Sequence, residues 1–260
     1  MKIWKAHYKD KFHDVDTDII NPETDHNEPL SLVIDGIEFS GVSIGDLELK
    51  DANKYDEIKD KFCILRSGGY SVYGIDVSYC YELQRYSLDV DIPVTVVRRC
   101  DDSETEGIIH ISFEYKEQDK SKHRAKMYCG NELVYHDDAV VHEFSLHVDG
   151  KCFHSSRLTL DFESALTDIC RQTAKEYRIK CCFTCQYSDY SPYGNDYFGS
   201  MLCYCDNKED YLKVNNKGEF IEHFSDTPYK MRQETYLCGE YSVRDKYPGY
   251  RGYVSGVNDT

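Results

Sequence analysis

Apolar and polar residues alternate with a period of two through most of the first 160 residues, the pattern of β-strands with one buried face. The alternation is clearest over residues 88–96, 109–115 and 140–148. Asp35-Gly36 and Asp149-Gly150 each separate two such runs, and Asp-Gly is a strong signal for a two-residue hairpin turn. Because little helical pattern lies between the runs, the sequence predicts an antiparallel β-sandwich or open barrel in this part of the chain.

One histidine falls within this alternating pattern. In the run 140–148, His142 has the same parity as Phe144 and Leu146, so it is expected on the buried face of a strand. A core histidine with satisfied hydrogen bonds is therefore favoured there over a catalytic base.

A single helix is predicted over residues 161–178. Asp161 is a good N-cap residue, and Glu163 lies in the first turn, where the helix dipole favours an anion. The apolar positions follow a three- and four-residue spacing: Phe162, Leu166, Ile169, Thr173 and Tyr177. The helix would connect a β domain over residues 1–160 to a tail over residues 179–260.

The tail changes in character and is rich in cysteine and tyrosine. Strand-like segments are predicted at 199–204, 210–214, 218–224 and 233–237, so the tail is expected to be a small Cys-rich β segment. Tyrosines gather in one loop: Tyr187, Tyr190, Tyr193 and Tyr197. Because tyrosine suits both interfaces and small cores, this loop is expected either to bind a partner or to cover a metal site.

Four cysteines of the tail form a candidate metal site. Cys182 and Cys185 are in a C-x-x-C motif, which lets one tight turn present two thiolates to a metal ion. Cys203 and Cys238 would complete a tetrahedral set, as structural Zn²⁺ requires. The sequence therefore predicts a structural zinc site that staples the tail.

The second half of this zinc motif is irregular, so substitutes and alternatives stay open. Cys205 could replace Cys203, and His223 could supply an imidazole ligand. Buried free thiols and a redox-active C-x-x-C are the alternatives to a zinc site.

Other chemical motifs are weak or absent. Asp14, Asp16 and Asp18 form a D-x-D-x-D run, but Ile19 and Asp25 stand where a calcium loop needs Gly and Glu. A solvated acidic loop is therefore expected at these aspartates. The sequence has no G-x-S-x-G motif and no phosphate-binding loop.

The charge of the chain is strongly and unevenly negative. The 260 residues carry a formal net charge of −16, with 40% hydrophobic and 30% charged residues. Residues 171–260 contain 12 Lys+Arg and 13 Asp+Glu, so residues 1–170 carry a net charge of −15. Such a field disfavours nucleic acid and anionic membranes and favours a basic protein partner; its alternative role is solubility alone.

The expected compartment is the cytoplasm. No apolar run approaches the roughly 18–20 residues of a membrane helix, and the first residues lack the apolar stretch of a signal peptide. The 12 cysteines are then expected to be mostly reduced.

Residues 180–245 resemble the C-terminal segment of an uncharacterised bacterial family of unknown function. The resemblance rests on Cys182, Cys185, the SDYSPYG run at 188–194, Phe198-Gly199, Cys203, Glu234-Thr235 and Cys238. It implies no catalytic residues. The size and acidity of the chain are also similar to those of immunity proteins of bacterial toxin systems.

These observations together favour a non-enzymatic acidic binding protein with a structural metal site. The alternative is a thiol-dependent or hydrolytic enzyme that uses the C-terminal cysteine cluster.

Overall fold

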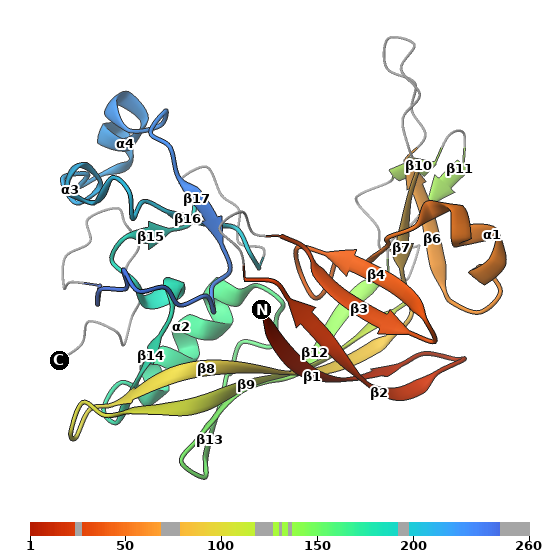
Figure 1. The fold of residues 1–260 in the computed structure, drawn as a ribbon, viewed down its shortest axis with the longest axis horizontal. Coiled ribbons are helices and arrows are strands. Elements are labelled where there is room, and N and C mark those ends of the chain that lie inside the picture. The colour runs from red at the N-terminus through yellow and green to blue at the C-terminus, as the bar shows by residue number, and fades with distance from the viewer. Residues whose placement is uncertain are drawn as a thin grey trace. The chain divides into compact units, whose positions relative to one another are not determined.

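The computed structural model describes residues 1–23, 28–68, 79–117, 127–129, 132–134, 137–191 and 198–244. The chain is mainly β, as predicted: it contains a 12-stranded antiparallel sheet, a three-stranded sheet and a two-stranded hairpin (Figure 1). The strands of the large sheet are β1 (Lys2–Lys9), β2 (Asp14–Asn21), β3 (Leu30–Ile34), β4 (Ile37–Gly41), β5 (Glu48–Leu49), β6 (Ile64–Gly68), β7 (Tyr79–Leu83), β8 (Ser87–Arg98), β9 (Glu104–Lys116), β12 (Asp138–Val148), β13 (Lys151–His154) and β14 (Tyr177–Lys180). The two-stranded hairpin consists of β10 (Met127–Cys129) and β11 (Glu132–Val134).

The large sheet is open. Its order is β13-β12-β9-β8-β1-β2-β3-β4-β5-β7-β6, and β14 pairs with β8 outside this path. The sheet therefore ends at β13 and β6, and mostly neighbouring segments of the chain pair with each other.

Both predicted Asp-Gly hairpins are present. Asp35 and Gly36 have φ values of 49° and 76°, and Asp149 and Gly150 have 50° and 73°. Positive φ at both central residues is the requirement of a type I′ turn, which Asp-Gly meets at low cost. The second turn fixes the register of β12 against β13, with Val148 opposite Lys151.

His142 is not a core residue, so that prediction is wrong. Its side chain is 49% exposed, and its Nε2 lies 2.5 Å from Oε1 of Glu114. The inward positions change parity along β12, because Val141 is buried and the next buried apolar residue is Phe144. A strict period of two cannot reveal such a shift.

The acidic run at 14–18 is a strand and not a loop. Asp14, Asp16 and Asp18 lie in β2 directly opposite three residues of β1: Lys9, His7 and Lys5. Lys5 Nζ lies 2.7 Å from Asp18 Oδ1, and Lys9 Nζ lies 2.5 Å from Asp14 Oδ2. These aspartates are thus partly neutralised by cross-strand partners.

The predicted helix is present but shorter than expected. Helix α2 (Phe162–Thr173) begins at Asp161, whose carboxylate accepts a hydrogen bond from the Ser164 backbone N–H. The helix ends at Thr173 and not at the predicted residue 178, because Tyr177 begins β14, which pairs with Thr95–Arg98 of β8. Tyr177 and Ile179 are buried on one face of β14, so a strand pattern follows the helix immediately.

The tail contains helices where strands were predicted. Helices α3 (Lys208–Tyr211) and α4 (Lys217–His223) occupy the predicted strands 210–214 and 218–224. Asn216 caps α4 by accepting a hydrogen bond from the Glu219 N–H. The three-stranded sheet consists of β15 (Ser188–Asp189), β16 (Met201–Cys203) and β17 (Lys230–Arg232), so the predicted strand at 233–237 is absent.

The described residues also contain three short helical elements: η1 (Ala52–Lys54), which runs into α1 (Tyr55–Ile58), and η2 (Cys182–Thr184). The described residues therefore contain more helices than the single one predicted. Among the described residues, no helix is both long and apolar enough to cross a membrane.

The chain divides into two compact units. Unit 1 comprises residues 1–21, 29–90 and 111–142, and unit 2 comprises 22–28, 91–110 and 143–260. The boundaries fall inside β8, β9 and β12, so each of these strands contributes residues to both units. The division of the sequence at residues 160 and 178 stays a prediction.

Candidate functional site

The four predicted zinc ligands lie in three segments of the tail. Cys182 begins η2, and Cys185 follows it and forms a β-bridge with Val243. Cys203 ends β16, opposite Ser188 of β15. The Cys182 N–H donates to the carbonyl of Tyr236, which brings the chain before Cys238 alongside η2.

These cysteines influence one another electrostatically. Burial raises the pKa of the Cys182 thiol well above its usual range, and the neighbouring thiols of Cys203, Cys185, Cys181 and Cys238 add to this. Burial likewise raises the pKa of Cys203 to about 12 and raises that of Cys185. The fold therefore brings the predicted ligands into one region, where Cys182, Cys185 and Cys203 are buried and Cys238 is half-buried.

The zinc site itself stays a prediction. Within the described residues, the tail cysteines do not form a group of three or more whose ligand atoms all lie within 4.8 Å of one another. Of the two substitutes, Cys205 is half-buried and interacts with Asp206, 3.7 Å from its Sγ, and His223 ends α4. The donor types still suit zinc, which prefers cysteine thiolates in structural sites.

The tyrosine-rich loop is described only in part. Tyr193 and Tyr197 lie outside the described residues. Tyr190 donates a 3.0 Å hydrogen bond to Glu234, whose carboxylate also accepts from the Gly199 N–H at 2.8 Å. Tyr187 lies under the ammonium group of Lys208, 5.1 Å from the ring centre. The described tyrosines thus make contacts within the tail.

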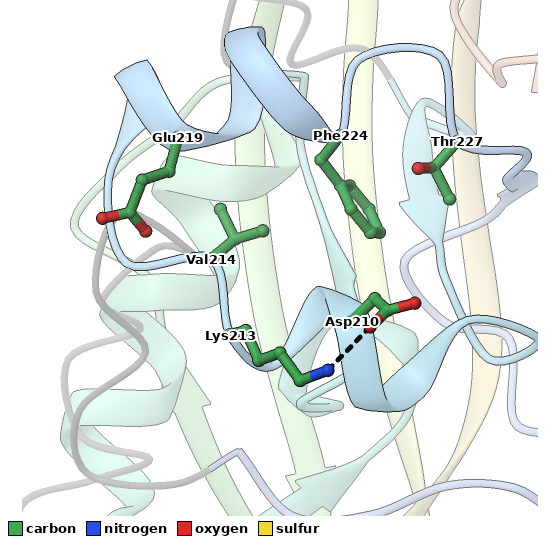
Figure 2. A pocket seen from close by; sticks show the side chains of 6 residues that line it. All are labelled: Asp210, Lys213, Val214, Glu219, Phe224 and Thr227. Atoms are coloured by element: carbon green, nitrogen blue, oxygen red, sulfur yellow. Dashed lines mark hydrogen bonds and ion pairs between the residues drawn. The ribbon is translucent and has the colours of Figure 1, made fainter.

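A pocket of about 320 Å³ opens between α3 and α4 (Figure 2). Its lining residues are Asp210, Lys213, Val214, Glu219, Phe224 and Thr227. The charged groups on its wall already have partners, since Lys213 Nζ lies 2.8 Å from Asp210 Oδ1 and Glu219 accepts from the Asn215 N–H. These contacts leave the pocket without a clear ligand class.

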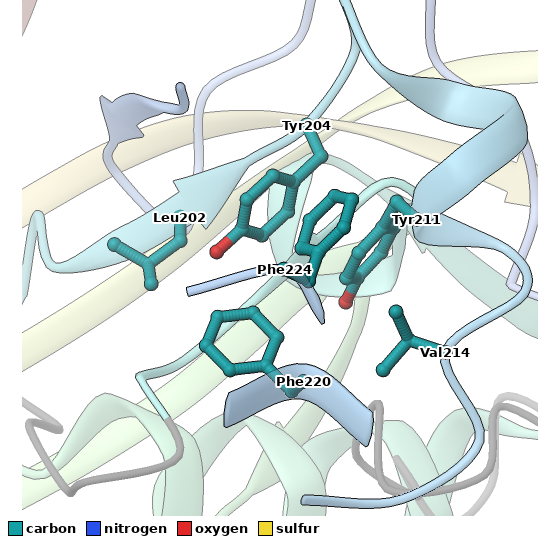
Figure 3. Packing of buried hydrophobic residues seen from close by; sticks show 6 residues of the cluster. All are labelled: Leu202, Tyr204, Tyr211, Val214, Phe220 and Phe224. Atoms are coloured by element: carbon teal, nitrogen blue, oxygen red, sulfur yellow. The ribbon is translucent and has the colours of Figure 1, made fainter. Parts of the chain in front are cut away.

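Val214 and Phe224 of this pocket also belong to a small aromatic core of the tail (Figure 3). It consists of Leu202, Tyr204, Tyr211, Val214, Phe220 and Phe224. The rings of Tyr204 and Tyr211 stack with their centroids 4.5 Å apart. The tail therefore has apolar packing of its own, independent of any metal ion.

A second cluster of metal-binding side chains lies on the hairpin of β12 and β13. Within the described residues, Glu143, His147 and Cys152 are the group whose ligand atoms lie within 4.8 Å of one another. Cys152 Sγ is 3.6 Å from His147 Nε2 and 3.3 Å from His154 Nε2. His154 Nδ1 is in turn 3.3 Å from Glu143 Oε1. We refer to these four residues as the hairpin cluster.

The hairpin cluster has an ordered polar surrounding. Ser145 donates a 2.8 Å hydrogen bond to Glu143 Oε1 and lies 3.1 Å from His147 Nε2. This hydrogen bond lowers the pKa of Glu143, and three nearby imidazoles lower it further: His110, His154 and His147. The carboxylate of Glu143 is therefore favoured in its ionised form beside these histidines.

The sequence contains a signal for this cluster in the predicted Asp149-Gly150 turn. The Asp149-Gly150 turn sets His147 opposite Cys152 and Ser145 opposite His154. Glu143 and His147 are four residues apart in one strand, so they share a face with these partners. Combining the predicted turn with strand parity would have brought these side chains together.

Unit 1 contains a different kind of charged feature. Glu48 of β5 is directly opposite Glu82 of β7. Burial raises the pKa of Glu48, and the charges of Asp46 and Glu82 raise it further. Like charges opposite each other destabilise a strand pair, and the 2.8 Å hydrogen bond that Glu82 accepts from the Ser67 hydroxyl offsets part of this cost.

The chain was also compared with known proteins. No curated protein and no solved structure gives a significant match. A family model described as a family of unknown function, DUF6304, matches residues 2–188. The matched range contains Cys182 and Cys185 and ends before Cys203 and Cys238. Because the model covers most of the chain, the protein belongs to this family of unknown function.

Proposed function

We propose that this chain is a non-enzymatic, cytoplasmic binding protein that recognises a basic protein through acidic side chains of unit 1. An immunity-like role, in which the chain neutralises a basic toxin, is one form of this function. The observation that carries the proposal is the pair Glu48 and Glu82, which stand directly opposite each other on adjacent strands.

The local electrostatics support a basic partner. Glu48 and Glu82 are both half-buried, and the pKa of Glu48 is raised by burial and by neighbouring carboxylates. A lysine or arginine of a partner placed beside them would add charge-assisted hydrogen bonds to the contacts that Glu82 already makes, including the one from Ser67. The net charge of −15 over residues 1–170 would also speed the encounter with a basic protein.

The alternative, a thiol enzyme that uses the tail cysteines, receives less support. A nucleophilic cysteine needs an accessible thiolate with a lowered pKa. Cys182 and Cys185 are instead buried, and burial raises the pKa of both thiols. A binding role agrees better with this chemistry.

The proposal is tested by capture from a lysate of the organism of origin on the immobilised chain. Glu48→Gln combined with Glu82→Gln removes the opposed pair and should abolish capture of a basic protein. Because the attraction is electrostatic, high salt should weaken the wild-type complex more than tenfold. The change would be measured as a faster dissociation rate or as a higher dissociation constant. Mass spectrometry identifies the captured protein and its charge.

The matched control is Asp14→Asn combined with Asp18→Asn. It removes the same number of negative charges from unit 1, at two aspartates of β2 that pair with Lys9 and Lys5. Capture should survive in this control. If both double variants behave alike, or if capture is indifferent to salt, Glu48 and Glu82 do not form the recognition site.

A further inference from the structure

We propose that the hairpin cluster is a binding site for a divalent transition-metal ion, with Zn²⁺ as its test ligand. Glu143, His147 and Cys152 would be three of the ligands, and His154 would be the fourth donor. The site is separate from the tail cysteines, and the proposal does not depend on the binding function of unit 1.

The distances between donor atoms suit a tetrahedral zinc ion. Zinc binds sulfur at about 2.3 Å and imidazole nitrogen at about 2.0–2.1 Å, so tetrahedral S and N ligands lie about 3.5 Å apart. Cys152 Sγ lies 3.6 Å from His147 Nε2 and 3.3 Å from His154 Nε2. Each imidazole is therefore at the separation from the sulfur that a shared zinc ion would require. His154 lies outside the group of three whose ligand atoms are all within 4.8 Å of one another, so its ring would move to become the fourth ligand.

The donor types also favour zinc or a similar ion. Imidazole and thiolate are borderline or soft ligands, and they select transition metals over Mg²⁺ and Ca²⁺. Glu143 adds one negative oxygen donor within 4.8 Å of the His147 and Cys152 ligand atoms. A Cys, two His and one Glu would satisfy the four positions that zinc prefers.

The backbone holds these donors on a regular scaffold. Glu143 and His147 project from β12, and Cys152 and His154 project from the paired strand β13. Asp149, in the connecting turn, accepts two 2.6 Å hydrogen bonds from Arg98 of β8. Sites on paired strands are positioned more precisely than sites on loops, so binding would require movement of side chains and not of the backbone.

Neighbouring polar groups resemble an outer shell around the donors. Ser145 holds the Glu143 carboxylate by a 2.8 Å hydrogen bond, as metal ligands are commonly held by a second layer, and its contact with His147 Nε2 would be replaced when that nitrogen binds a metal ion. Beyond them, His110 packs edge-on to His147 and is bonded to Asp91, with Nδ1 2.7 Å from Oδ1. His110 is thus oriented by a carboxylate beside the cluster.

The same residues also outline a Cys-His-Glu chain of the kind that activates a nucleophilic thiol. Such a chain needs one imidazole beside the sulfur. Here His147 and His154 both present Nε2 to Cys152, which a shared metal ion explains and a single general base does not. The geometry therefore favours metal binding.

The experiment measures alkylation of Cys152 in the full-length chain, followed by mass spectrometry of the peptide that contains it. Added Zn²⁺ should slow alkylation of Cys152 tenfold or more in the wild type. His147→Gln and His154→Gln should each raise the Zn²⁺ concentration needed for protection at least tenfold. Because the readout is confined to one cysteine, metal bound at the tail cysteines does not affect it.

The control variant is His142→Gln, which changes an exposed histidine of the same strand that pairs with Glu114 instead. It should keep full protection, and thermal unfolding of all variants shows that they are folded. Equal alkylation with and without Zn²⁺, or protection that survives both histidine substitutions, overturns the proposal. If Cys152 is alkylated rapidly without metal and His154→Gln slows that reaction, the metal-site proposal is overturned and Cys152 is an activated thiol.

Discussion

Glu234 shows how one residue of the tail determines a property of the whole chain. Its carboxylate is fully buried and accepts hydrogen bonds from the Gly199 N–H and the Tyr190 hydroxyl. Burial raises its pKa from 4.5 to about 8, and the hydrogen bonds counteract only part of that shift. The folded chain therefore holds a proton at Glu234 over a pH range in which the unfolded chain has lost it.

Stability should therefore fall as the pH rises between these two pKa values. The raised folded-state pKa means that the folded state binds more protons, so Glu234 contributes about −1.4 kcal/mol per pH unit to the free energy of unfolding. Glu234→Gln should flatten this slope between pH 5 and pH 8. Urea unfolding at several pH values measures it.

The matched control is Glu240→Gln, which removes one negative charge from an exposed glutamate paired with Lys208. It should leave the slope unchanged. Equal slopes for the wild type and Glu234→Gln would show that this carboxyl does not control the pH dependence.

At the scale of single residues, the sequence predicted local features best. The Asp-Gly turns and the Asp161 cap are present because each depends only on neighbouring backbone atoms. His142 was placed wrongly because the parity of β12 changes between Val141 and Phe144. The hairpin cluster was missed because its residues are chemically related only across a strand pair.

At the scale of elements, the tail shows how η2 and β16 could serve a metal ion. Cys182→Ser should abolish zinc binding and cost several kcal/mol of stability, because structural zinc binding is coupled to folding. Metal analysis and urea unfolding of the purified chain measure both effects. The control is Cys181→Ser, an adjacent buried cysteine outside the predicted ligand set.

Cys181→Ser should keep the metal and lose little stability, since a serine hydroxyl can accept the hydrogen bond that the Cys181 sulfur accepts from Thr184. A wild-type chain without zinc would contradict the prediction. So would equal destabilisation by the two substitutions.

The elements of the tail were harder to predict than those of the sheet. The segment 218–224 was predicted as a strand, but Phe220 and Phe224 are four residues apart, a spacing that also fits one face of a helix such as α4. The Asn216 cap and Glu219 in the first turn would have indicated a helix start. Short apolar segments fit both periods, so caps decide between them.

At the scale of the whole molecule, neither compact unit is one continuous stretch of the sequence. Unit 2 combines residues 91–110 with 143–260. A fragment of residues 161–260 would lack β8, the partner of β14, and β13, which contacts α2. The buried face of α2, including Phe162, Leu166 and Ile169, would then be exposed to water.

Such a fragment should therefore aggregate or unfold without a cooperative transition, despite the aromatic core of the tail. Burial of each large apolar side chain contributes about 1.5–3 kcal/mol, so exposing these three side chains of α2 would remove about as much free energy as the whole net stability of many domains. Circular dichroism and thermal unfolding, with the full-length chain as reference, measure this. A soluble fragment with one sharp transition would instead support a domain boundary near residue 160.

The two-residue turn between β12 and β13 has a consequence for how this chain can vary. Successive side chains of a strand point to opposite faces, so inserting one residue after Gly150 would move Cys152 and His154 to the face of Phe144 and Leu146. Evolutionary change in the length of this loop is therefore limited by the donor residues on the two strands that it connects. Relatives that keep the four donors should keep the loop at two residues, whereas relatives that lost the donors would tolerate insertions and deletions there.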